Sequence, residues 1–377
     1  MGGQVSIPEG VHVVVVGGGF GGIAAAQHLK SHGVPFTLID MREAFHHNVA
    51  GLRASVQPGF AQRTFIPSGG LSPAGSAAVR CRVCPAGDPV FHLILHATDW
   101  PRFPEVPHSD RAGTSVQKYQ DLLDRWVHLC SSVRVLLWTL MSSVCRSRRA
   151  DSILVVGGGS TGVEMAAEIR TEYPEKKVVL IHSRIGLADP ELLSSVRQQA
   201  KEVLLEKGVE LLLGQKVNGL SELQLNKTQK NMQVSTDKGE TLTTDLIISC
   251  TGLKVNSAAY TSSMTDSGAL RVNQHLQVHG FSNIFAVGDC SDTAEPQTAY
   301  AAGLHATVAV TNILNSLKGA ELKEYRPGNV SMLLAMGHDD GVGQFVGYRL
   351  PRFLVALGKS RDLLLWKSWR EMQQSQP

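Results

Sequence analysis

Two glycine-rich segments, far apart in the chain, constrain its fold more than any other feature of the sequence. Each follows an apolar, β-branched run and reads Gly-x-Gly-x-x-Gly, at Gly17–Gly22 and at Gly157–Gly162. A stretch typical of a helix start follows both segments. A buried parallel strand, a tight glycine turn and a helix N-terminus together bind the pyrophosphate of a dinucleotide. The sequence therefore predicts two Rossmann-like units.

Each glycine of the pattern meets a different physical requirement. The first allows the tight turn, the second lets a pyrophosphate approach the backbone, and the third lets the helix pack closely on the strand. A glycine-rich turn without a ligand is the alternative, and the strand and helix around both copies argue against it. The candidate cofactor-binding residues are Gly17, Gly18, Gly19, Phe20, Gly21 and Gly22 in the first segment, and Gly157, Gly159 and Gly162 in the second.

The end of the strand after each segment predicts which nucleotide is bound. Asp40 ends the first of these strands, at the offset where an acid binds a ribose hydroxyl. The second unit has His182 and Arg184 there, and no acid. Because an arginine at this place accepts the 2′-phosphate of NADP, we expect the second site to admit NADPH, with NADH also open. An ordinary exposed strand end is the alternative for both residues.

Two later apolar runs also end in turns. Residues 246–250 lead to Thr251 and Gly252, and residues 284–287 lead to Gly288 and Asp289. The carboxyl ends of parallel strands form the ligand edge of an open α/β sheet. Gly252 and Asp289 are therefore further candidate cofactor-binding residues.

Length, composition and charge narrow the class of protein. The chain has 377 residues, enough for two or three domains, and its 43% hydrophobic and 18% charged residues exclude a disordered chain. A formal net charge of +3 argues against nucleic-acid binding. No run reaches the ~20 apolar residues of a membrane span, and no basic stretch marks a signal peptide. Six cysteines in a chain of this length fit a reducing compartment.

Both ends of the chain predict contact with a membrane surface. Gly2 and Ser6 fit the N-myristoylation pattern, with Gly2 as the acceptor, and a chance match is the alternative. Residues 349–372 contain six basic and two acidic residues interleaved with leucine, phenylalanine and tryptophan. Such a segment lies on an anionic membrane surface or packs as a cap on a neighbouring domain. A single acyl chain binds membranes only marginally, so we expect the two features to act together.

Five further motifs, with the two glycine segments, resemble the apoptosis-inducing-factor-like ferroptosis suppressors among the two-dinucleotide-binding-domain flavoproteins. The resemblance covers residues 1–66 and 149–377, and the motifs are Phe45–Ala50, Leu52–Ser55, Val163–Ile169, Ala299–Ala306 and Asp340–Gln344. It implies an α/β fold in which an NAD(P)H domain is inserted into a discontinuous FAD domain and a small C-terminal α+β domain follows. The implied boundaries are 1–148 and 267–325 for the FAD domain, 149–266 for the NAD(P)H domain and 326–377 for the C-terminal domain.

The resemblance also implies an activity. The family reduces lipid quinones such as ubiquinone and vitamin K with NAD(P)H, and the hydroquinones suppress lipid peroxidation and ferroptosis. FAD, or a modified flavin, would be held by the first glycine segment with Arg53 and Asp289. NADH or NADPH would be held by the second segment. The implied location is the cytoplasm, on the cytosolic face of the lipid droplet, the plasma membrane or the mitochondrial outer membrane.

Two residues are implied in catalysis. Glu164 would meet the nicotinamide or flavin edge, and Lys359 would lie near the flavin or the quinone head group. The structural alternatives are a helix-start acid favoured by the helix dipole and a solvated surface lysine. No metal site is expected.

The positions of the cysteines exclude a disulfide reductase of this architecture. Residues 1–80 and 150–249 contain no cysteine, so no pair stands in the segments that flank the flavin in such enzymes. Electrons are therefore expected to pass from the flavin directly to an external acceptor. Two other functions stay open: an apoptosis-linked flavoprotein that binds a partner or DNA, and an inactive nucleotide-binding pseudoenzyme.

Residues 69–150 depart from the rest of the chain in composition. They contain four of the six cysteines and three of the five tryptophans, and stretches such as 101–107 show neither helix nor strand periodicity. Where the family has Ala-Thr-Gly, this chain has Ala97, Thr98 and Asp99. We expect an irregular segment here. Our hypothesis is a shifted reading frame or a retained non-coding stretch in the gene, with a divergent insertion as the rival.

Overall fold

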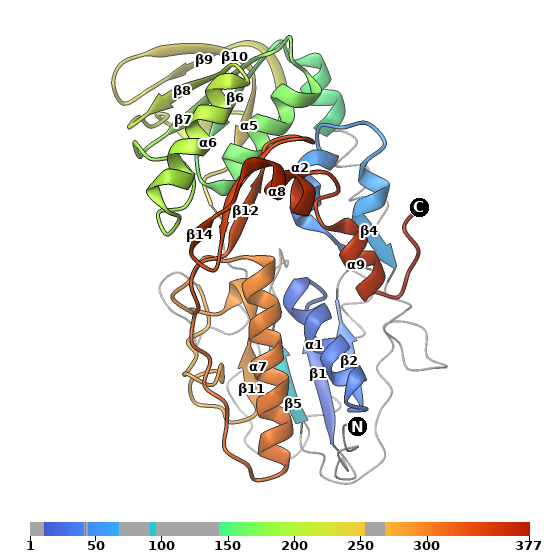
Figure 1. Cartoon of the computed structure of the whole chain (residues 1–377). Helices are drawn as coiled ribbons and strands as arrows, with labels where there is room; N and C mark the ends of the chain where they lie inside the picture. The colour runs from blue at the N-terminus through green and yellow to red at the C-terminus, as the bar shows by residue number, and fades with distance from the viewer. Residues whose placement is uncertain (1–10, 41, 43, 68–90, 96–142, 253–267) are drawn as a thin grey trace.

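The computed structural model describes residues 11–40, 42, 44–67, 91–95, 143–252 and 268–377, and all structural statements below concern these residues. They form two parallel sheets with helices, and a smaller antiparallel sheet near the C-terminus (Figure 1).

The first sheet contains four parallel strands in the order β11-β5-β1-β2. The strands are β1 (His12–Val16), β2 (Phe36–Ile39), β5 (Phe91–Leu95) and β11 (Ile284–Ala286). Helices α1 (Phe20–Ser31) and α7 (Ala299–Leu317) lie side by side on this sheet (Figure 1). The strands place alternate β-branched residues in the core, and the helices contribute small and aliphatic residues. The shared core includes Val13, Val15, Ala25, Leu29, Phe285, Ala306, Val310 and Ile313.

The second sheet has the order β8-β7-β6-β10-β9, and all its strands are parallel except the edge strand β9. The strands are β6 (Ser152–Val156), β7 (Lys177–His182), β8 (Val209–Leu213), β9 (Thr228–Ser235) and β10 (Thr241–Ser249). Helices α5 (Ser160–Glu172) and α6 (Ser194–Glu206) contribute buried aliphatic residues to the same core as the sheet. The near-continuous apolar runs of β6 and β7 fit strands that are covered on both faces.

The C-terminal residues form a third layer between these two units (Figure 1). It contains the antiparallel strands β12 (Met332–Ala335), β13 (Gly341–Phe345) and β14 (Tyr348–Arg349), followed by α8 (Arg352–Val355), a π-helical turn (Ala356–Ser360) and α9 (Leu365–Glu371). The smaller elements are β3 (Ala44–His46), α2 (Asn48–Ala54), the 3₁₀ turns Ala61–Thr64 and Gly288–Cys290, and β4 (Phe65–Pro67). Strands β3 and β4 form an antiparallel pair. Another 3₁₀ turn, Leu220–Glu222, precedes β9. The predicted fold class, with two Rossmann-like units and a small α+β part, is confirmed.

Within the segment 69–150, which the sequence marks as irregular, the structure describes two regular elements. Residues 91–95 form β5, which pairs with β1 on one side and β11 on the other, so they occupy the middle of the first sheet. Residues 143–149 are helical and lead into β6. This short strand, four apolar residues and His92, gains ladder hydrogen bonds from a partner strand on each side. The periodicity of so short a run could not show these partners. The Pro-rich stretch 101–107 lies outside the described residues. So do residues 116–127, where the spacing of apolar residues predicts a helix with one apolar face.

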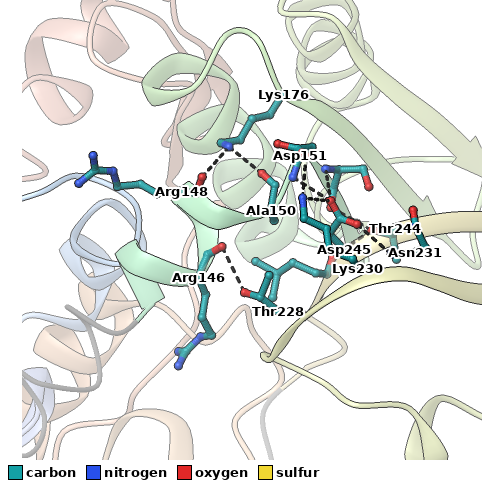
Figure 2. Close-up of polar contacts among 12 residues, drawn as sticks. Arg146, Arg148, Ala150, Asp151, Lys176, Thr228, Lys230, Asn231, Thr244 and Asp245 are labelled. Atoms are coloured by element: carbon teal, nitrogen blue, oxygen red, sulfur yellow. Dashed lines mark hydrogen bonds and ion pairs between the residues drawn. The ribbon is translucent and has the colours of Figure 1, made fainter.

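A polar cluster fixes the path of the chain into β6 (Figure 2). Asp245 accepts hydrogen bonds from the backbone N–H of Asp151 at 2.9 Å and of Asn231 at 3.0 Å. Lys176 Nζ donates to the carbonyl oxygens of Arg148 and Ala150, at 3.0 and 2.6 Å. Burial alone would raise the pKa of Asp245, but these N–H groups and Lys230 outweigh it and lower the pKa to about 2. The cluster stands at the amino end of β6, away from the glycine turn, and is therefore structural.

Candidate functional site

The first glycine turn has the backbone geometry that its sequence predicted. Gly17 adopts φ +100°, which disfavours any residue with a side chain, and its N–H donates to the Ile39 carbonyl at 2.7 Å. A Cβ on Gly22 would lie 1.8 Å from the carbonyl oxygen of Gly17. Helix α1 can therefore pass this close to the end of β1 only with glycine at position 22.

The second glycine turn repeats this geometry. Gly157 adopts φ +107°, and a Cβ on Gly162 would again lie 1.8 Å from the carbonyl oxygen of the first glycine. A Cβ on Gly159 would meet nothing within 4 Å, so space for a ligand exists above the turn. Within the described chain, no side chain caps α1 or α5. Their first-turn N–H groups are therefore suited to a pyrophosphate, as FAD and NAD(P)H require.

The residues that end β2 and β7 hold equivalent positions in the two units. Asp40 accepts a hydrogen bond from the Gly18 N–H at 2.5 Å, and His182 Nδ1 accepts one from the Gly158 N–H at 3.0 Å. Sequence spacing placed both residues at the ligand edge, and the structure adds that each supports the turn of its own unit. The acceptor for the turn N–H is the carboxylate of Asp40 in the first unit and the neutral imidazole of His182 in the second.

The tautomer of His182 determines what the second unit presents at this edge. Because Nδ1 accepts from Gly158, the ring proton is on Nε2. The Arg184 Nε–H is directed at that Nε2 from 3.4 Å, so the guanidinium and the imidazole lie next to each other. Burial lowers the pKa of His182, and Arg184 and Arg197 lower it further. A ligand with acceptor oxygens would satisfy both donors.

Asp289 and Gly252 lie at the carboxyl ends of their strands, as predicted. Gly288 has φ +69° and begins the 3₁₀ turn that contains Asp289, directly after β11. Gly252 has φ +115° and follows β10, with nothing within 4 Å of its Cβ position. Because the strands are parallel, each residue shares an edge with the glycine turn of its own sheet.

The structure brings the two residues implied in catalysis together. Lys359 Nζ donates to Glu164 Oε1 at 2.7 Å and to the Leu333 carbonyl at 2.6 Å. The same carboxylate oxygen accepts from the Ala335 N–H at 2.7 Å. The pair joins the first turns of α5 to the C-terminal layer, and its lysine lies in the π-helical turn, a distortion often found at functional sites. Its two side chains are only 10–12% exposed, so Lys359 is not a solvated surface lysine. The alternative of a helix-start acid favoured by the helix dipole stays open for Glu164.

His47 connects this ion pair to the first glycine turn. Its ring centroid lies 5.0 Å from that of Phe20, edge to face, and its Nδ1 accepts from the Ala50 N–H at 3.2 Å. Burial lowers the pKa of His47 to about 4, and the positive charge of Lys359 adds to this effect against an opposing backbone hydrogen bond. Glu164 of the second unit therefore pairs with Lys359 of the C-terminal layer, and the charge of Lys359 acts on His47 of the first unit.

Arg53 has partners that sequence reasoning did not foresee. Its guanidinium is fully buried and pairs in bidentate form with Glu168, Nε to Oε2 at 2.9 Å and Nη2 to Oε1 at 2.7 Å. It also donates to the carbonyl oxygens of Gly337 and Arg361, at 3.1 and 3.2 Å. These contacts give Arg53 a role in joining three parts of the chain. A contact with the flavin stays a prediction.

The basic C-terminal segment is divided between the core and the surface. Leu363, Leu365, Trp369 and Met372 are buried in one apolar cluster with residues of α1, α2 and β4. Phe353, Leu354, Leu357 and Trp366 are exposed. Packing as a cap on the first unit is therefore correct for the first group, and the second group remains at the surface.

Gly2 lies outside the described residues. Within the described chain, no helix has both the length and the hydropathy that crossing a bilayer requires. No group of three or more His, Cys, Asp and Glu side chains suited to a metal ion occurs there. The described cysteines are Cys145, Cys250 and Cys290, and they form no disulfide with one another.

Family models and individual relatives both match this chain to flavoprotein oxidoreductases and their nucleotide-binding domains. A model of the pyridine nucleotide-disulphide oxidoreductases matches residues 92–306, and a model of NAD(P)-binding Rossmann-like domains matches residues 15–55. Ferroptosis suppressor protein 1 is 49% identical over 394 residues in Homo sapiens and 46% identical over 397 residues in Xenopus laevis, with 100% of both chains covered in each case. Apoptosis-inducing factor homolog B of Dictyostelium discoideum is 28% identical, with 98% of both chains covered.

Solved structures support the fold. The water-forming NADH oxidase from Lactobacillus brevis, bound to NADH, matches 88% of this chain and 74% of its own, with a TM-score of 0.54 and 19% identity. An engineered NADPH-bound mutant of that oxidase matches with a TM-score of 0.59.

Proposed function

Because this chain belongs to the pyridine nucleotide-disulphide oxidoreductase family, with ferroptosis suppressor protein 1 among its relatives, we propose that it reduces lipid quinones with electrons from NAD(P)H. It is an NAD(P)H-dependent flavoprotein oxidoreductase with FAD as its cofactor. The proposed substrates are quinones of the ubiquinone or vitamin K type, and the product hydroquinones would suppress lipid peroxidation and ferroptosis. The observation that carries the proposal is the largely buried Glu164–Lys359 pair, which joins the second dinucleotide unit to the C-terminal layer.

The ion pair would serve the reaction by holding charge in place. When bound, FAD supplies an acceptor for two electrons from the nicotinamide and a donor of two electrons to the quinone. Glu164 and the Leu333 carbonyl hold the Lys359 ammonium at one position before substrate arrives. A fixed cation in a partly buried site stabilises negative charge that develops on a carbonyl oxygen, without reorganisation of water.

Neither Cys250 nor Cys290 competes with this route. Burial raises the pKa of the Cys250 thiol to about 11, so the thiolate needed for disulfide exchange is not formed near neutral pH. Cys290 is buried in an apolar cluster. These observations support direct electron transfer to an external acceptor.

The second unit favours NADPH in this proposal. The Nε2–H of His182 and the Arg184 guanidinium are neighbouring donors at the end of β7, where the family's fold places the ribose 2′ substituent. Arg184→Ala should therefore raise the KM for NADPH by about tenfold while changing that for NADH little, since one charge-assisted contact is lost. Equal changes for both nucleotides would refute this assignment.

Membrane attachment at the cytosolic face would bring the enzyme to its substrate. A myristoyl group on Gly2 would supply one signal. Exposed apolar side chains of the C-terminal layer, next to the exposed Arg349 and Arg370, support a second; they are Phe345, Val346, Tyr348, Phe353, Leu354, Leu357 and Trp366. Lipid droplet, plasma membrane and mitochondrial outer membrane are the proposed locations. Sedimentation of myristoylated protein with anionic vesicles tests the first signal: Gly2→Ala should abolish it and Gly3→Ala should not.

Lys359→Met tests the proposed catalytic pair. We expect quinone reduction at saturating NADPH to slow by about a hundredfold, as when one preorganised electrostatic contact is removed from an active site. Lys367→Met is the matched control, because Lys367 pairs with Glu371 on the exposed face of α9. The flavin absorption spectrum confirms that each variant is folded and loaded. A folded, FAD-loaded Lys359→Met enzyme with the rate of the control would overturn the assignment.

A further inference from the structure

A buried polar cluster lies directly behind the turn that contains Asp289. His305, on α7, is 2% exposed, and its Nδ1 accepts a hydrogen bond from the Gly288 N–H at 3.0 Å. Its Nε2 lies 2.6 Å from Glu295 Oε1, and the Tyr325 hydroxyl donates to the same oxygen at 2.6 Å. The Tyr325 ring also packs edge to face on the imidazole, with centroids 4.5 Å apart.

These contacts allow His305 one tautomer. A backbone N–H can only donate, so Nδ1 must carry the lone pair that receives the Gly288 hydrogen. The proton then stands on Nε2 and is donated to Glu295. Burial raises the pKa of Glu295, but the hydrogen bonds from His305 and Tyr325 outweigh it and keep the carboxyl ionised. Burial and Glu295 raise the pKa of Tyr325, which remains a donor.

The turn itself is held on both sides of Asp289. On the amino side, His305 holds the Gly288 N–H, where φ is +69°. On the carboxyl side, Gln297 Nε2 donates to the Asp289 carbonyl oxygen at 3.0 Å. The direction of the Asp289 side chain follows from the backbone between these two contacts. None of the catalytic contacts described above uses His305, Glu295 or Tyr325.

We propose that His305 is a positioning residue for the flavin cofactor, with its Nδ1 lone pair setting the Gly288–Asp289 turn and with Glu295 and Tyr325 holding the ring in the required tautomer. The inference rests on the proposed function and on the placement of FAD against Asp289 that the family resemblance implies. It requires an acceptor at the Nδ1 position rather than an imidazole as such.

Two substitutions separate the two sides of the ring. In His305→Asn, the amide oxygen takes the place of Nδ1 and keeps an acceptor for Gly288. In His305→Gln, the amide nitrogen takes the place of Nε2 and keeps only the donor to Glu295. Titration of the apoprotein with FAD, followed by flavin fluorescence, should give the Asn variant nearly wild-type affinity. The Gln variant should bind about tenfold more weakly, because a buried N–H has lost its partner.

The near-ultraviolet and visible circular dichroism of the bound flavin gives a second readout, which should be wild-type in the Asn variant and altered in the Gln variant. Equal FAD affinity and equal flavin dichroism in the two variants would overturn the positioning role. Asp289→Asn tests the contact between FAD and Asp289 separately from the role of His305. Unchanged FAD binding in that variant would show that Asp289 does not bind FAD, and the inference about His305 would fall with it. If Asp289→Asn binds FAD more weakly but the two His305 variants have equal FAD affinity and flavin dichroism, Asp289 binds FAD and only the inference about His305 is wrong.

One measurement needs no variant. Nitrogen-15 NMR of histidine-labelled wild-type protein reports which ring nitrogen of His305 carries the proton. A signal for the Nε2–H tautomer supports the proposal. A signal for protonated Nδ1 contradicts it, even if both substituted proteins fail to fold.

Discussion

Gly22 and Gly162 stand where each helix passes the carbonyl oxygen of the first glycine of its segment. A Cβ added at either glycine would lie 1.8 Å from that carbonyl oxygen, so the restriction is the same in both units. Backbone atoms cannot move aside as a flexible side chain can, so glycine is required by space at these positions. This requirement is local, and the sequence pattern therefore predicted it correctly.

Gly162→Ala should destabilise the protein by about 1–3 kcal/mol, the usual cost of forcing an extra methyl group into a packed site. Gly303→Ala is the matched control, because a Cβ there meets nothing within 4 Å and the residue lies inside helix α7. Alanine in that helix should stabilise by about 0.5–1 kcal/mol. Urea unfolding measures both changes. The same sign for the two variants would contradict the spatial argument.

The sequence pattern around a single residue could not predict its contacts with residues far away in the chain. Asp40 and His182 were found by their offset from the glycines, but their bonds to Gly18 and Gly158 follow from the closed turn. Arg53 was assigned to the flavin because of its place after the second strand. Its partner Glu168 belongs to the other unit, and nothing in the local pattern of either residue indicates the other. A sequence signal for His305 did exist: it is a polar residue on the buried face of α7.

Among the elements, α2 begins with an unusual cap. His47 is its N-cap, and it can accept from the Ala50 N–H only when Nδ1 is unprotonated. The folded state holds the pKa of His47 at about 4, below the ordinary value of 6.5. The unfolded chain therefore binds a proton as the pH falls below about 6.5 while the folded chain does not. The contribution of His47 to the free energy of unfolding is therefore fully present above about pH 6.5 and decreases as the pH falls toward 4.

His47→Asn should reduce this sensitivity to acid, since asparagine keeps a capping oxygen and does not titrate. Between about pH 7 and about pH 5, the wild type should lose on the order of 2 kcal/mol more unfolding free energy than the variant. Urea unfolding at the two pH values is the measurement. His279→Asn, at an exposed position, should behave as wild type. Parallel losses in wild type and His47→Asn would show that this histidine does not contribute.

Elements with strong periodicity or glycine punctuation were predicted, and those that depend on partners were not. Strand β5 is recognisable as a central strand only once β1 and β11 stand beside it. The π-helical turn at Ala356–Ser360 has no sequence signature, yet it places Lys359 beside Glu164. For the C-terminal segment, amphipathic spacing showed that one face is apolar, and only the fold shows which leucines are buried.

At the scale of the whole molecule, two buried or largely buried ion pairs join the parts of the chain. Arg53 and Glu168 connect α2 to α5 and, through Gly337 and Arg361, to the C-terminal layer. Glu164 and Lys359 connect α5 to the same layer. Both pairs include an acid of α5, so this helix fixes the second unit against the rest of the molecule. The distance for electron transfer between the two nucleotide sites would depend on that arrangement.

Arg53→Met should destabilise the protein by about 3–5 kcal/mol, because it leaves Glu168 buried without a partner. The double variant Arg53→Met with Glu168→Leu removes both charges and should regain most of that loss. Thermal unfolding of the FAD-loaded proteins compares them. If the single variant is as stable as the double variant, the buried pair does not hold the units together in the way described.

The hypothesis on the origin of residues 69–150 can be tested on the whole protein. If the segment results from a shifted reading frame or a retained non-coding stretch, the chain as written should express poorly and bind little FAD. A stable, yellow, FAD-loaded protein would reject that hypothesis and favour the divergent insertion. The placement of 91–95 within the first sheet shows that part of this stretch belongs to the fold.

The central claim is that electrons pass from NAD(P)H through the flavin to a quinone. Anaerobic mixing of the purified, FAD-reconstituted protein with NADPH, followed by a short-chain ubiquinone, tests it most directly. The account predicts loss of the oxidised flavin absorption on adding NADPH and its return on adding the quinone. A folded, FAD-loaded protein whose absorption does not change with NADPH, or does not return with quinone, would contradict it.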